Sequence, residues 1–274
     1  MNTAFFDPTM PDKIKQYWNE RARDMGASTQ VTTDDIFMRE LEIAKLKEKI
    51  SAISLPDGST VTDVGCGDGY STLSIAAAFP TVRFIGIDYS EKMLALAEER
   101  RLAQPDLLER VSFQLGDMRR LSTGVQADRF EVIMTMRSLI NISTSREQYD
   151  VLRQFAEHLK AGGYYFGSEN FMQGQNNFNR LRTAMGLPEI PIRWHNHFFD
   201  EEEFLAETEK FFDSVIIDNF SSSYFLATRV IYSAGCHLRG EQPDYFHPIH
   251  QIAGRLPVIG DFSPIKLVSM RRKL

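Results

Sequence analysis

Apolar side chains in the first fifty residues recur at the spacing of a helix. After Pro11 they stand at Ile14, Tyr17, Trp18, Ala22 and Met25. A proline in the first turn and Gly26 just past the last turn are typical helix ends, so we predict a helix over 11–25. A second helix is predicted within "TTDDIFMRELEIAKLKEKI" (32–50), where a threonine caps the start and two acids complement the helix dipole.

From Thr60 onwards the pattern changes to short apolar runs that alternate with helical spacing. Continuous apolar runs of this length are typical of buried parallel strands. We predict five of them: "TVTDVG" (60–65), "VRFIGID" (82–88), "RVSFQLGD" (110–117), "RFEVIMTM" (129–136) and "YYFGSENF" (164–171). Because helical patterns separate these runs, we predict an α/β fold, a doubly wound sheet with helices on both faces.

The C-terminal half departs from this alternation. Residues 171–199 are rich in Asn, Gln, Pro and aromatic residues, and we predict an irregular insertion there. A helix is predicted over 200–212, and two strands over "DSVIIDNF" (213–220) and "SSYFLATRVIYSAG" (222–235). Two strands without a helix between them indicate antiparallel pairing, so the predicted sheet has seven strands, mostly parallel, with an antiparallel last strand. No secondary structure is predicted from Arg239 onwards.

Composition narrows the class of protein. The chain has 274 residues, of which 43% are hydrophobic and 25% charged, as in soluble globular proteins. A net charge of -6 argues against a nucleic-acid partner. No apolar stretch is long enough to span a membrane, and the N-terminal segment lacks the regions of a signal peptide. Cys66 and Cys236 lie too far apart for a metal-ligand motif or a disulfide framework, so we expect a cytoplasmic protein without a metal.

The loop after the first predicted strand, "DVGCGDGY" (63–70), is rich in glycine. The dinucleotide-binding fingerprint is G-x-G-x-x-G, but the glycines here are Gly65, Gly67 and Gly69, so the third comes one residue early. Asp63, at the mouth of the loop, would repel a pyrophosphate and attract a cationic ammonium group. The loop therefore favours a cofactor other than a dinucleotide.

Two further carboxylates follow the next two strands. Asp88 stands at the end of the second strand, where an acid can accept both hydroxyls of a ribose. Asp117 stands at the end of the third strand and can accept a hydrogen bond from an exocyclic amine. The three carboxylates together predict a ligand with an amine, a ribose and a base, and without a phosphate.

In this order, D-V-G-C-G-D-G, I-G-I-D-Y-S and L-G-D-M resemble the motifs of class I S-adenosylmethionine-dependent methyltransferases, over roughly residues 50 to 235. The resemblance implies S-adenosylmethionine as cofactor and S-adenosylhomocysteine as product. It implies that the first motif holds the methionyl end, the acid after strand two the ribose, and the acid after strand three the adenine. The cofactor-binding residues so implied are Asp63, Gly65, Cys66, Gly67, Gly69, Asp88, Tyr89, Met93, Gly116, Asp117 and Met118, with Tyr17 and Trp18 as a loose match to an aromatic lid.

The acceptor side carries weaker signals. After strand four, "MRSLINI" lacks the Pro-Pro-aromatic string of family members that methylate base amines or planar amides. Arg137 is placed to contact the cofactor or an anionic acceptor, or else to form a structural salt bridge. In "RWHNHFF", His195 and His197 are the hypothesised general bases, with Glu169 as a further catalytic candidate. A metal held by these histidines and Glu169 is the alternative, and no metal is predicted.

We therefore predict a methyltransferase that acts on an O or N atom of a small molecule, such as a metabolite or a sugar-like or biosynthetic intermediate. The predicted division is an N-terminal helical cap or lid (1–50), a Rossmann-like core with the insertion (51–238) and a C-terminal extension (239–274). No nucleic-acid or membrane partner is predicted, and a homo-oligomer stays open. Two alternatives remain: a nicotinamide-dependent Rossmann oxidoreductase, and a non-catalytic S-adenosylmethionine-binding regulatory protein.

Overall fold

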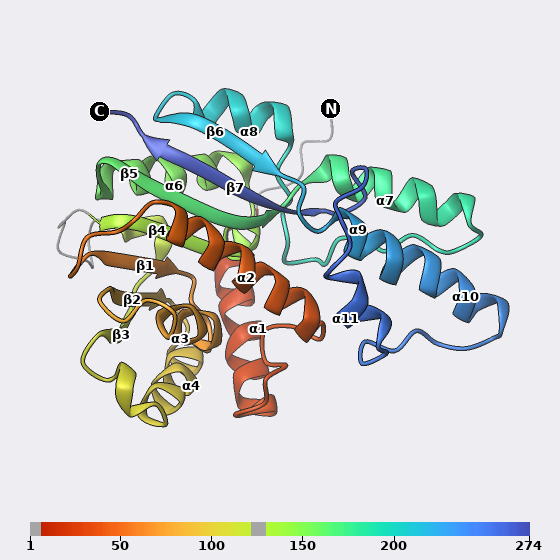
Figure 1. Ribbon diagram of the computed structural model, residues 1–274, viewed down its shortest axis with the longest axis horizontal. Helices are drawn as coiled ribbons and strands as arrows, with labels where there is room; N and C mark the ends of the chain where they lie inside the picture. The colour runs from red at the N-terminus through yellow and green to blue at the C-terminus, as the bar shows by residue number, and fades with distance from the viewer. Residues whose placement is uncertain (1–6, 122–129) are drawn as a thin grey trace.

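The computed structural model describes residues 7–121 and 130–274 (Figure 1). Seven strands form one sheet in the order β3-β2-β1-β4-β5-β7-β6. The strands are β1 (Thr60–Val64), β2 (Arg83–Asp88), β3 (Val111–Leu115), β4 (Phe130–Met136), β5 (Leu159–Asn170), β6 (Phe212–Asp218) and β7 (Ile265–Arg272). β1 to β5 pair in parallel with one another, which confirms the doubly wound sheet expected from the alternating pattern.

Helices flank both faces of this sheet, and others form a lobe beside it (Figure 1). The helices of the described chain are α1 (Met10–Met25), α2 (Ile36–Ala52), α3 (Tyr70–Ala76), α4 (Glu91–Leu102), α6 (Ser145–His158), α7 (Met172–Ala184), α8 (Glu201–Thr208), α9 (Ser222–Phe225), α10 (Ser233–Leu238) and α11 (Ile249–Ala253), with a π-helix (Leu226–Tyr232) between α9 and α10. None of the helices in the described part of the chain combines the length and the apolarity needed to cross a membrane.

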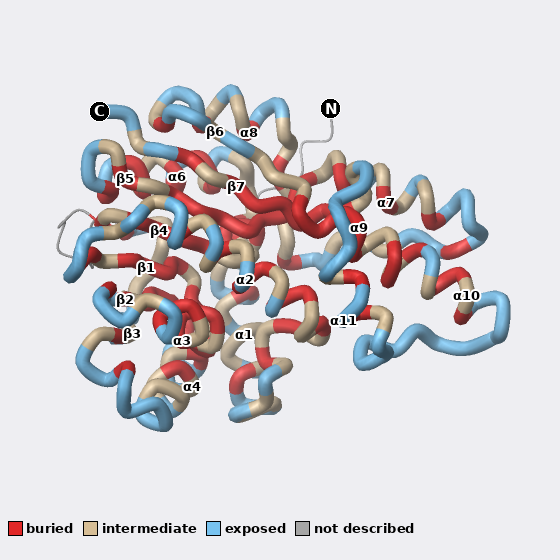
Figure 2. The backbone as a smooth tube through the Cα atoms, in the orientation of Figure 1, coloured by how far each residue is buried: buried red, intermediate tan, exposed pale blue. Residues whose placement is uncertain are grey.

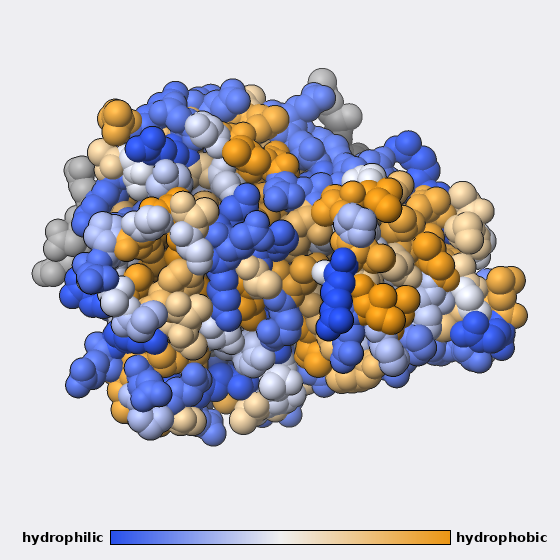
Figure 3. Space-filling view, in the orientation of Figure 1, coloured by the Kyte–Doolittle hydropathy of each residue, from blue (hydrophilic) through white to orange (hydrophobic). Residues whose placement is uncertain are grey.

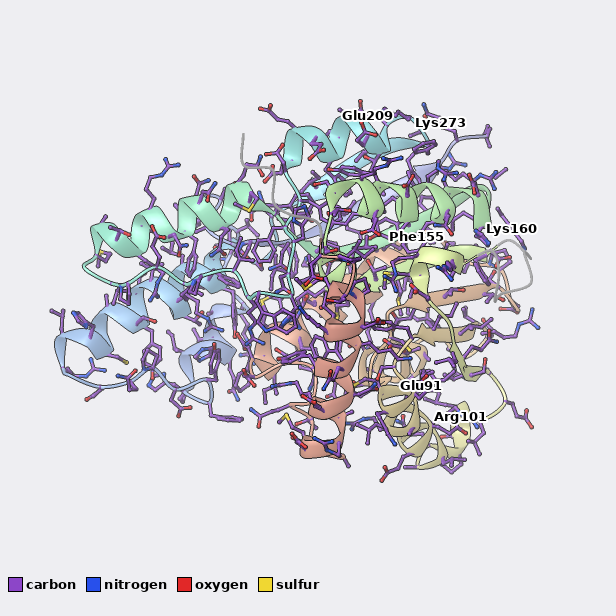
Figure 4. The ribbon with its side chains drawn as sticks, turned by 180° about the vertical axis from the view of Figure 1, so that it is seen from behind. Glu91, Arg101, Phe155, Lys160, Glu209 and Lys273 are labelled. Atoms are coloured by element: carbon purple, nitrogen blue, oxygen red, sulfur yellow. The ribbon has the colours of Figure 1, made fainter. Side chains whose placement is uncertain are left out.

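Two apolar cores hold the layers together. On one face α2 and α3 pack on the sheet, and Leu46 and Val61 are fully buried there. On the other face α6 and α8 bury Phe155 and Phe204 against β5 and β7. Figure 2 shows the inner strands β1, β4, β5 and β7 as largely buried, and Figure 4 shows Phe155 on α6 beside the sheet. Side chains of one strand alternate between these cores, as the period of a strand requires.

The prediction of a strand over 222–235 was wrong. This segment forms α9, the π-helix and the start of α10, which pack beside α7 in a lobe next to the sheet (Figure 1). Its apolar run is buried against other helices, and a buried helix and a buried strand have the same short apolar pattern. The same lobe exposes Ile252, Leu256 and Ile259, and apolar surface gathers over this region in Figure 3.

The antiparallel last strand exists, but the tail supplies it. β7 lies between β5 and β6 and is antiparallel to both. Lys273, which follows β7, donates a hydrogen bond of 2.7 Å to the backbone oxygen of Glu209, and Figure 4 shows the two residues close together. The expectation of no structure after Arg239 was therefore wrong. A boundary at residue 238 would separate the core from one of its inner strands.

Two smaller expectations also change. The cap of α2 is Asp35, which accepts from the Met38 N–H at 3.0 Å, and not a threonine. The segment 171–199 begins with helix α7, and an irregular stretch follows only after it. The N-terminal helices α1 and α2 are present as predicted.

The position of β7 leads to a stability prediction. Leu267 is fully buried on β7, whereas Ile216 on β6 is 53% exposed. Leu267→Ala should lower the free energy of unfolding by about 2–5 kcal/mol, because it leaves a cavity between two packed layers. Ile216→Ala should change it by less than about 1 kcal/mol. Urea unfolding of both variants measures the difference; equal small effects would show that β7 does not belong to the cooperative core.

Candidate functional site

A cavity of about 330 Å³ opens at the carboxyl ends of the parallel strands. In doubly wound sheets ligands bind at this edge, where the strand order reverses, and the reversal here lies between β1 and β4. The segments after β1 to β5 and the start of β7 all line the cavity, as do the N-terminal segment, α7 and the chain around His195. The cavity therefore extends along the sheet edge from β3 to β7.

The loop after β1 needs glycine at two positions. Gly65 has a φ of +78°, and a Cβ there would stand 2.3 Å from the Cβ of Ser138. Gly69 has a φ of +71° and precedes α3, and its added Cβ would stand 2.8 Å from that of Ala97. Both distances are shorter than a non-bonded contact between two carbon atoms can be, so a side chain would push the loop away from its neighbours.

Four backbone N–H groups of this loop are bonded within the protein. Those of Gly65 and Cys66 donate to the Ile87 carbonyl at 2.7 and 3.1 Å. The N–H of Gly67 donates to Oδ2 of Asp88 at 2.9 Å, and that of Gly69 to the Cys66 carbonyl at 3.1 Å. A pyrophosphate site needs such donors free and pointing at the ligand. This loop does not offer them.

Asp63 and Asp88 are buried and line the cavity. Burial raises the pKa of Asp63 from 3.8 to about 7; the hydrogen bond from Thr72 Oγ1, at 2.6 Å, opposes this shift and the charge of Asp88 adds to it. Burial also raises the pKa of Asp88 to about 6, against the hydrogen bonds from the N–H groups of Ser90 and Gly67. A cation in the cavity would favour the ionised form of both acids.

Asp117 also lines the cavity, but it has a partner in the protein. The Nε of Arg119 lies 3.0 and 3.1 Å from its two oxygens, and the Arg119 N–H donates to Oδ1 at 2.9 Å. Although burial acts in the opposite direction, these contacts hold the pKa of Asp117 below its ordinary value. An amine ligand would share this carboxylate with Arg119.

The other cofactor candidates divide into two groups. Tyr17 and Gly69 do not line the cavity. Burial raises the pKa of the Cys66 thiol well above its ordinary value, so this side chain is a neutral space-filler and not a nucleophile. The candidates that line the cavity are Trp18, Asp63, Gly65, Cys66, Gly67, Asp88, Tyr89, Met93, Gly116, Asp117, Met118 and Arg137.

The N-terminal helix α1 contacts the acceptor side. Trp18 Nε1 donates to Asn141 Oδ1 at 3.2 Å, after strand β4. The Tyr17 ring lies 4.6 Å from the His195 ring, and Trp194 packs edge-on against both. These aromatic contacts bring α1 and the segment after α7 together beside the cavity, in the position of a lid.

Arg137 directly follows β4 and lines the cavity. Its Nη2 lies 3.0 Å from Oε2 of Glu42, a fully buried residue of α2, so the expected salt bridge is present. Its Nε is buried and has no hydrogen-bond partner in the described structure. A structural ion pair and a ligand-facing role are therefore compatible in this residue.

The structure separates the two histidines. His195 lines the cavity, and burial, with the charges of Arg193 and Arg21, lowers its pKa to about 4. A ring with so low a pKa stays neutral and is a poor proton acceptor for a hydroxyl group. His197 does not line the cavity, and its Nε2 lies 2.9 Å from Ser145 Oγ. The geometry therefore does not favour His197 as a base.

Glu169 is also outside the cavity. It is fully buried, and Oε1 accepts the N–H groups of Ser138 and Leu139, each at 3.2 Å. Burial raises its pKa to about 7 despite these bonds. Strand alternation turns its side chain to the face opposite Asn170, so it orders the segment after β4 and does not meet a ligand.

Sequence reasoning missed several residues of the acceptor end. Arg229, on the π-helix, lines the cavity, pairs with Asp35 and stacks on the Tyr245 ring at 4.5 Å. Its segment was predicted as a strand, although a lone arginine in the apolar run "FLATRVIY" was an available signal. Asn170 and Gln175 are further cavity residues to which the sequence assigned no role. Among the described residues there is no cluster of His, Cys, Asp and Glu that could hold a metal ion.

Comparison with known proteins finds similarity over the part of the chain that contains β1 to β4. Residues 61–163 match the family model described as a methyltransferase domain. A trans-aconitate 2-methyltransferase of Variovorax paradoxus (strain S110) is 40% identical over 72 residues, 26% of this chain and 25% of that protein. A malonyl-[acyl-carrier protein] O-methyltransferase of Bacillus cereus is 28% identical over 146 residues, 52% of this chain and 49% of that protein. The chain thus spans half or less of the length of these relatives.

The whole fold also has a solved counterpart. The magnesium protoporphyrin IX methyltransferase of Synechocystis PCC 6803, solved with bound SAH, matches with a TM-score of 0.60 at 15% identity. The match covers 96% of this chain and 99% of that chain. At this identity the match shows the fold alone.

The raised pKa of Asp63 predicts a change of stability with pH. Because its pKa is higher in the folded protein than in the unfolded chain, folding favours the protonated acid. This contribution to the free energy of unfolding is full below pH 3.8 and is lost as the pH rises to about 7. Asp63→Asn should flatten this fall by about 2–4 kcal/mol. Urea unfolding between these pH values tests it, with exposed Asp57→Asn as control; a wild-type slope in Asp63→Asn would contradict the prediction.

Proposed function

We propose that the chain is a methyltransferase of the class I fold, which binds S-adenosylmethionine and methylates a small molecule in the cavity described above. One observation carries the proposal: a single cavity is lined both by the strand-end carboxylates Asp63, Asp88 and Asp117 and by Arg137 and Asn170, at the ends of β4 and β5. The two curated relatives, both named as methyltransferases, support the same type of reaction.

The residues present fit this cofactor. A carboxylate has about four acceptor positions, so both oxygens of Asp88 can still accept a ribose hydroxyl after binding the N–H groups of Gly67 and Ser90. Asp63, at the mouth of the glycine loop, gains stability from a cationic ammonium group, which lowers its raised pKa. Tyr89 and Met93 flank Asp88 and supply apolar contacts for the adenosine.

S-adenosylmethionine supplies, when bound, a methyl group on a positively charged sulfur. The chain itself contributes position and exclusion of water, which provide much of the rate of a methyl transfer. Trp18 and His195 bring the N-terminal helix and the segment after α7 together beside the cavity. A volume of about 330 Å³ is at the small end of ligand cavities, which favours a small acceptor.

The two alternatives find less support. A nicotinamide dinucleotide would need loop donors for its pyrophosphate, and the N–H groups of Gly65, Cys66 and Gly67 are bonded to Ile87 and Asp88. A protein that only binds the cofactor would not need a cavity that extends beyond β4. Two residues of the cavity lining have buried polar atoms without partners, Asn170 Oδ1 and His195 Nδ1, and these atoms favour a second ligand.

We also propose a cytoplasmic location and no nucleic-acid partner. Both cysteines are free and buried, which suits a reducing compartment. The net charge of -6 does not favour binding to a polyanion.

The first test is ligand binding. At a hundred times its dissociation constant, S-adenosylhomocysteine should raise the free energy of unfolding by about 2.7 kcal/mol, and NAD at the same concentration should not. Thermal unfolding with each ligand measures this. Labelled S-adenosylmethionine and a panel of small acceptors then test turnover. An equal shift with NAD would favour the oxidoreductase, and binding without labelled product the regulatory protein.

A second prediction concerns Asp88. Asp88→Ala removes the acceptor of the ribose hydroxyls and should weaken S-adenosylhomocysteine about 10- to 150-fold, the effect of one or two hydrogen bonds to a charged group. The variant also leaves the N–H groups of Gly67 and Ser90 without a partner, so its free energy of unfolding should fall by about 1–3 kcal/mol. Calorimetry on folded protein, with exposed Asp106→Ala as control, would refute the ribose role if both variants kept wild-type affinity.

A further inference from the structure

The acceptor end of the cavity contains no side chain suited to remove a proton, among the residues that the structure describes. Asp34 pairs with Arg21 and Arg193. Asp35 accepts from Tyr224 at 2.6 Å and pairs with Arg229. Burial, with the charges of Arg193 and Arg21, lowers the pKa of His195 to about 4, which makes it a weak base. The acids at the cofactor end are each bonded in turn: Asp63 to Thr72, Asp68 to Arg100, Asp88 to Gly67 and Ser90, Asp117 to Arg119, and Glu147 to Thr144. An acceptor that must lose a proton finds no base here.

Arg137 offers unused donors at the same end. Its backbone is in the left-handed region, with a φ of +52°, and its N–H donates to the Ser168 carbonyl at 2.7 Å. A non-glycine residue in this region marks a position where the surroundings hold the chain in place. The guanidinium has five N–H groups, and the ion pair with Glu42 engages only the Nη2 side. The side chain is 22% exposed and lines the cavity, so part of the fork is open to a ligand.

Asn170 lies next to Arg137 along the sheet edge. It ends β5, the neighbour of β4, and its side chain is 7% exposed, lines the cavity and has a buried Oδ1 without a partner. The amide can turn either its NH₂ group or its oxygen towards a ligand. By strand order, Arg137 and Asn170 stand one and two strands beyond the Gly65 loop. Both are therefore on the acceptor side of the methionyl position proposed above.

Apolar side chains surround this polar pair. The cavity wall beyond β4 includes Met38, Ile140, Phe178, Ile190, Phe225 and Ile265. In such surroundings opposite charges attract strongly, and a step that removes both charges is favoured over one that creates a charge. A neutral amine would become a cation beside Arg137 on methylation. A carboxylate would lose its negative charge together with the positive charge of the sulfonium.

We infer that the methylated group is a carboxylate of a small, largely apolar acid, held by Arg137 and Asn170, and that the product is a methyl ester. The inference rests on the proposed function. A carboxylate oxygen forms a bond to the methyl carbon, and the bond from this carbon to sulfur breaks, with its electron pair left on sulfur. No proton is released and no base is needed. Arginine matches carboxylate geometry through paired N–H groups, and each carboxylate oxygen so bound keeps a second lone pair that can attack the methyl carbon.

The product class gives a direct test. Wild-type protein is incubated with methyl-labelled S-adenosylmethionine and a panel of small acids, with the alcohol and amine of the same carbon skeleton as matched compounds. We expect label only with the acids, released as volatile methanol by mild alkali, and no proton release in a weakly buffered indicator solution. Alkali-stable label on alcohols or amines, with one proton released per turnover, overturns the carboxylate assignment and keeps the methyltransferase. No label on any compound counts against methyl transfer itself, and the assignment falls with it.

Variants test the two binding residues. Arg137→Met and Asn170→Ala should raise the KM of the best acid about 10- to 150-fold, the effect of lost hydrogen bonds to a charged group, and leave S-adenosylhomocysteine affinity within a few-fold. Because Arg137→Met leaves buried Glu42 unpaired, the pair Arg137→Met with Glu42→Gln serves where the single variant does not fold. Arg153→Met, on the exposed side of α6, is the matched control. An unchanged KM in the folded variants would overturn the role of Arg137 and Asn170 in acceptor binding. An equal loss of S-adenosylhomocysteine affinity would instead place Arg137 at the cofactor.

Discussion

The hydrogen bond from the Gly67 N–H to the Asp88 carboxylate decides what the cofactor end of the cavity can bind. It joins the loop after β1 to the end of β2 and turns the loop's donors towards the protein. With Gly65 and Cys66 bonded to the Ile87 carbonyl, the loop presents its shape to a ligand and not its N–H groups. The carboxylate meanwhile stays buried with acceptor positions to spare. One interaction thus disfavours a phosphate and favours hydroxyl groups.

The residues that line the cavity at the ends of β1 to β3 could be predicted from the sequence because their determinants are local. Asp63, Asp88 and Asp117 each stand at the end of a strand or directly after it, and parallel strands bring their carboxyl ends to one edge. Glycine at positions 65 and 69 likewise depends on the backbone of its own loop and on close neighbours. Such features keep their meaning whatever the rest of the chain does.

The acceptor half could not be read in this way. Arg229 reaches the cavity from a π-helix whose apolar run resembles a strand, and Ile265 from a strand that pairs between β5 and β6. Both placements depend on contacts between segments far apart in the sequence. His195 shows a different limit: it is near the cavity as predicted, yet the burial that places it there lowers its pKa and weakens it as a base. The sequence pattern predicts where the His195 side chain lies, whereas its surroundings in the fold set its pKa.

The late position of β7 in the chain has a consequence for how the protein is made. During synthesis β5 and β6 emerge first, and their facing edges have no partner until residues 265–272 leave the ribosome. Unpaired edges of this kind are sites of misassembly, and a pairing across so long a stretch of chain is slow to form. The β1 to β4 half can take shape early, whereas the cavity wall that Ile265 provides waits for β7. A nascent chain would therefore form one end of its cavity well before the other.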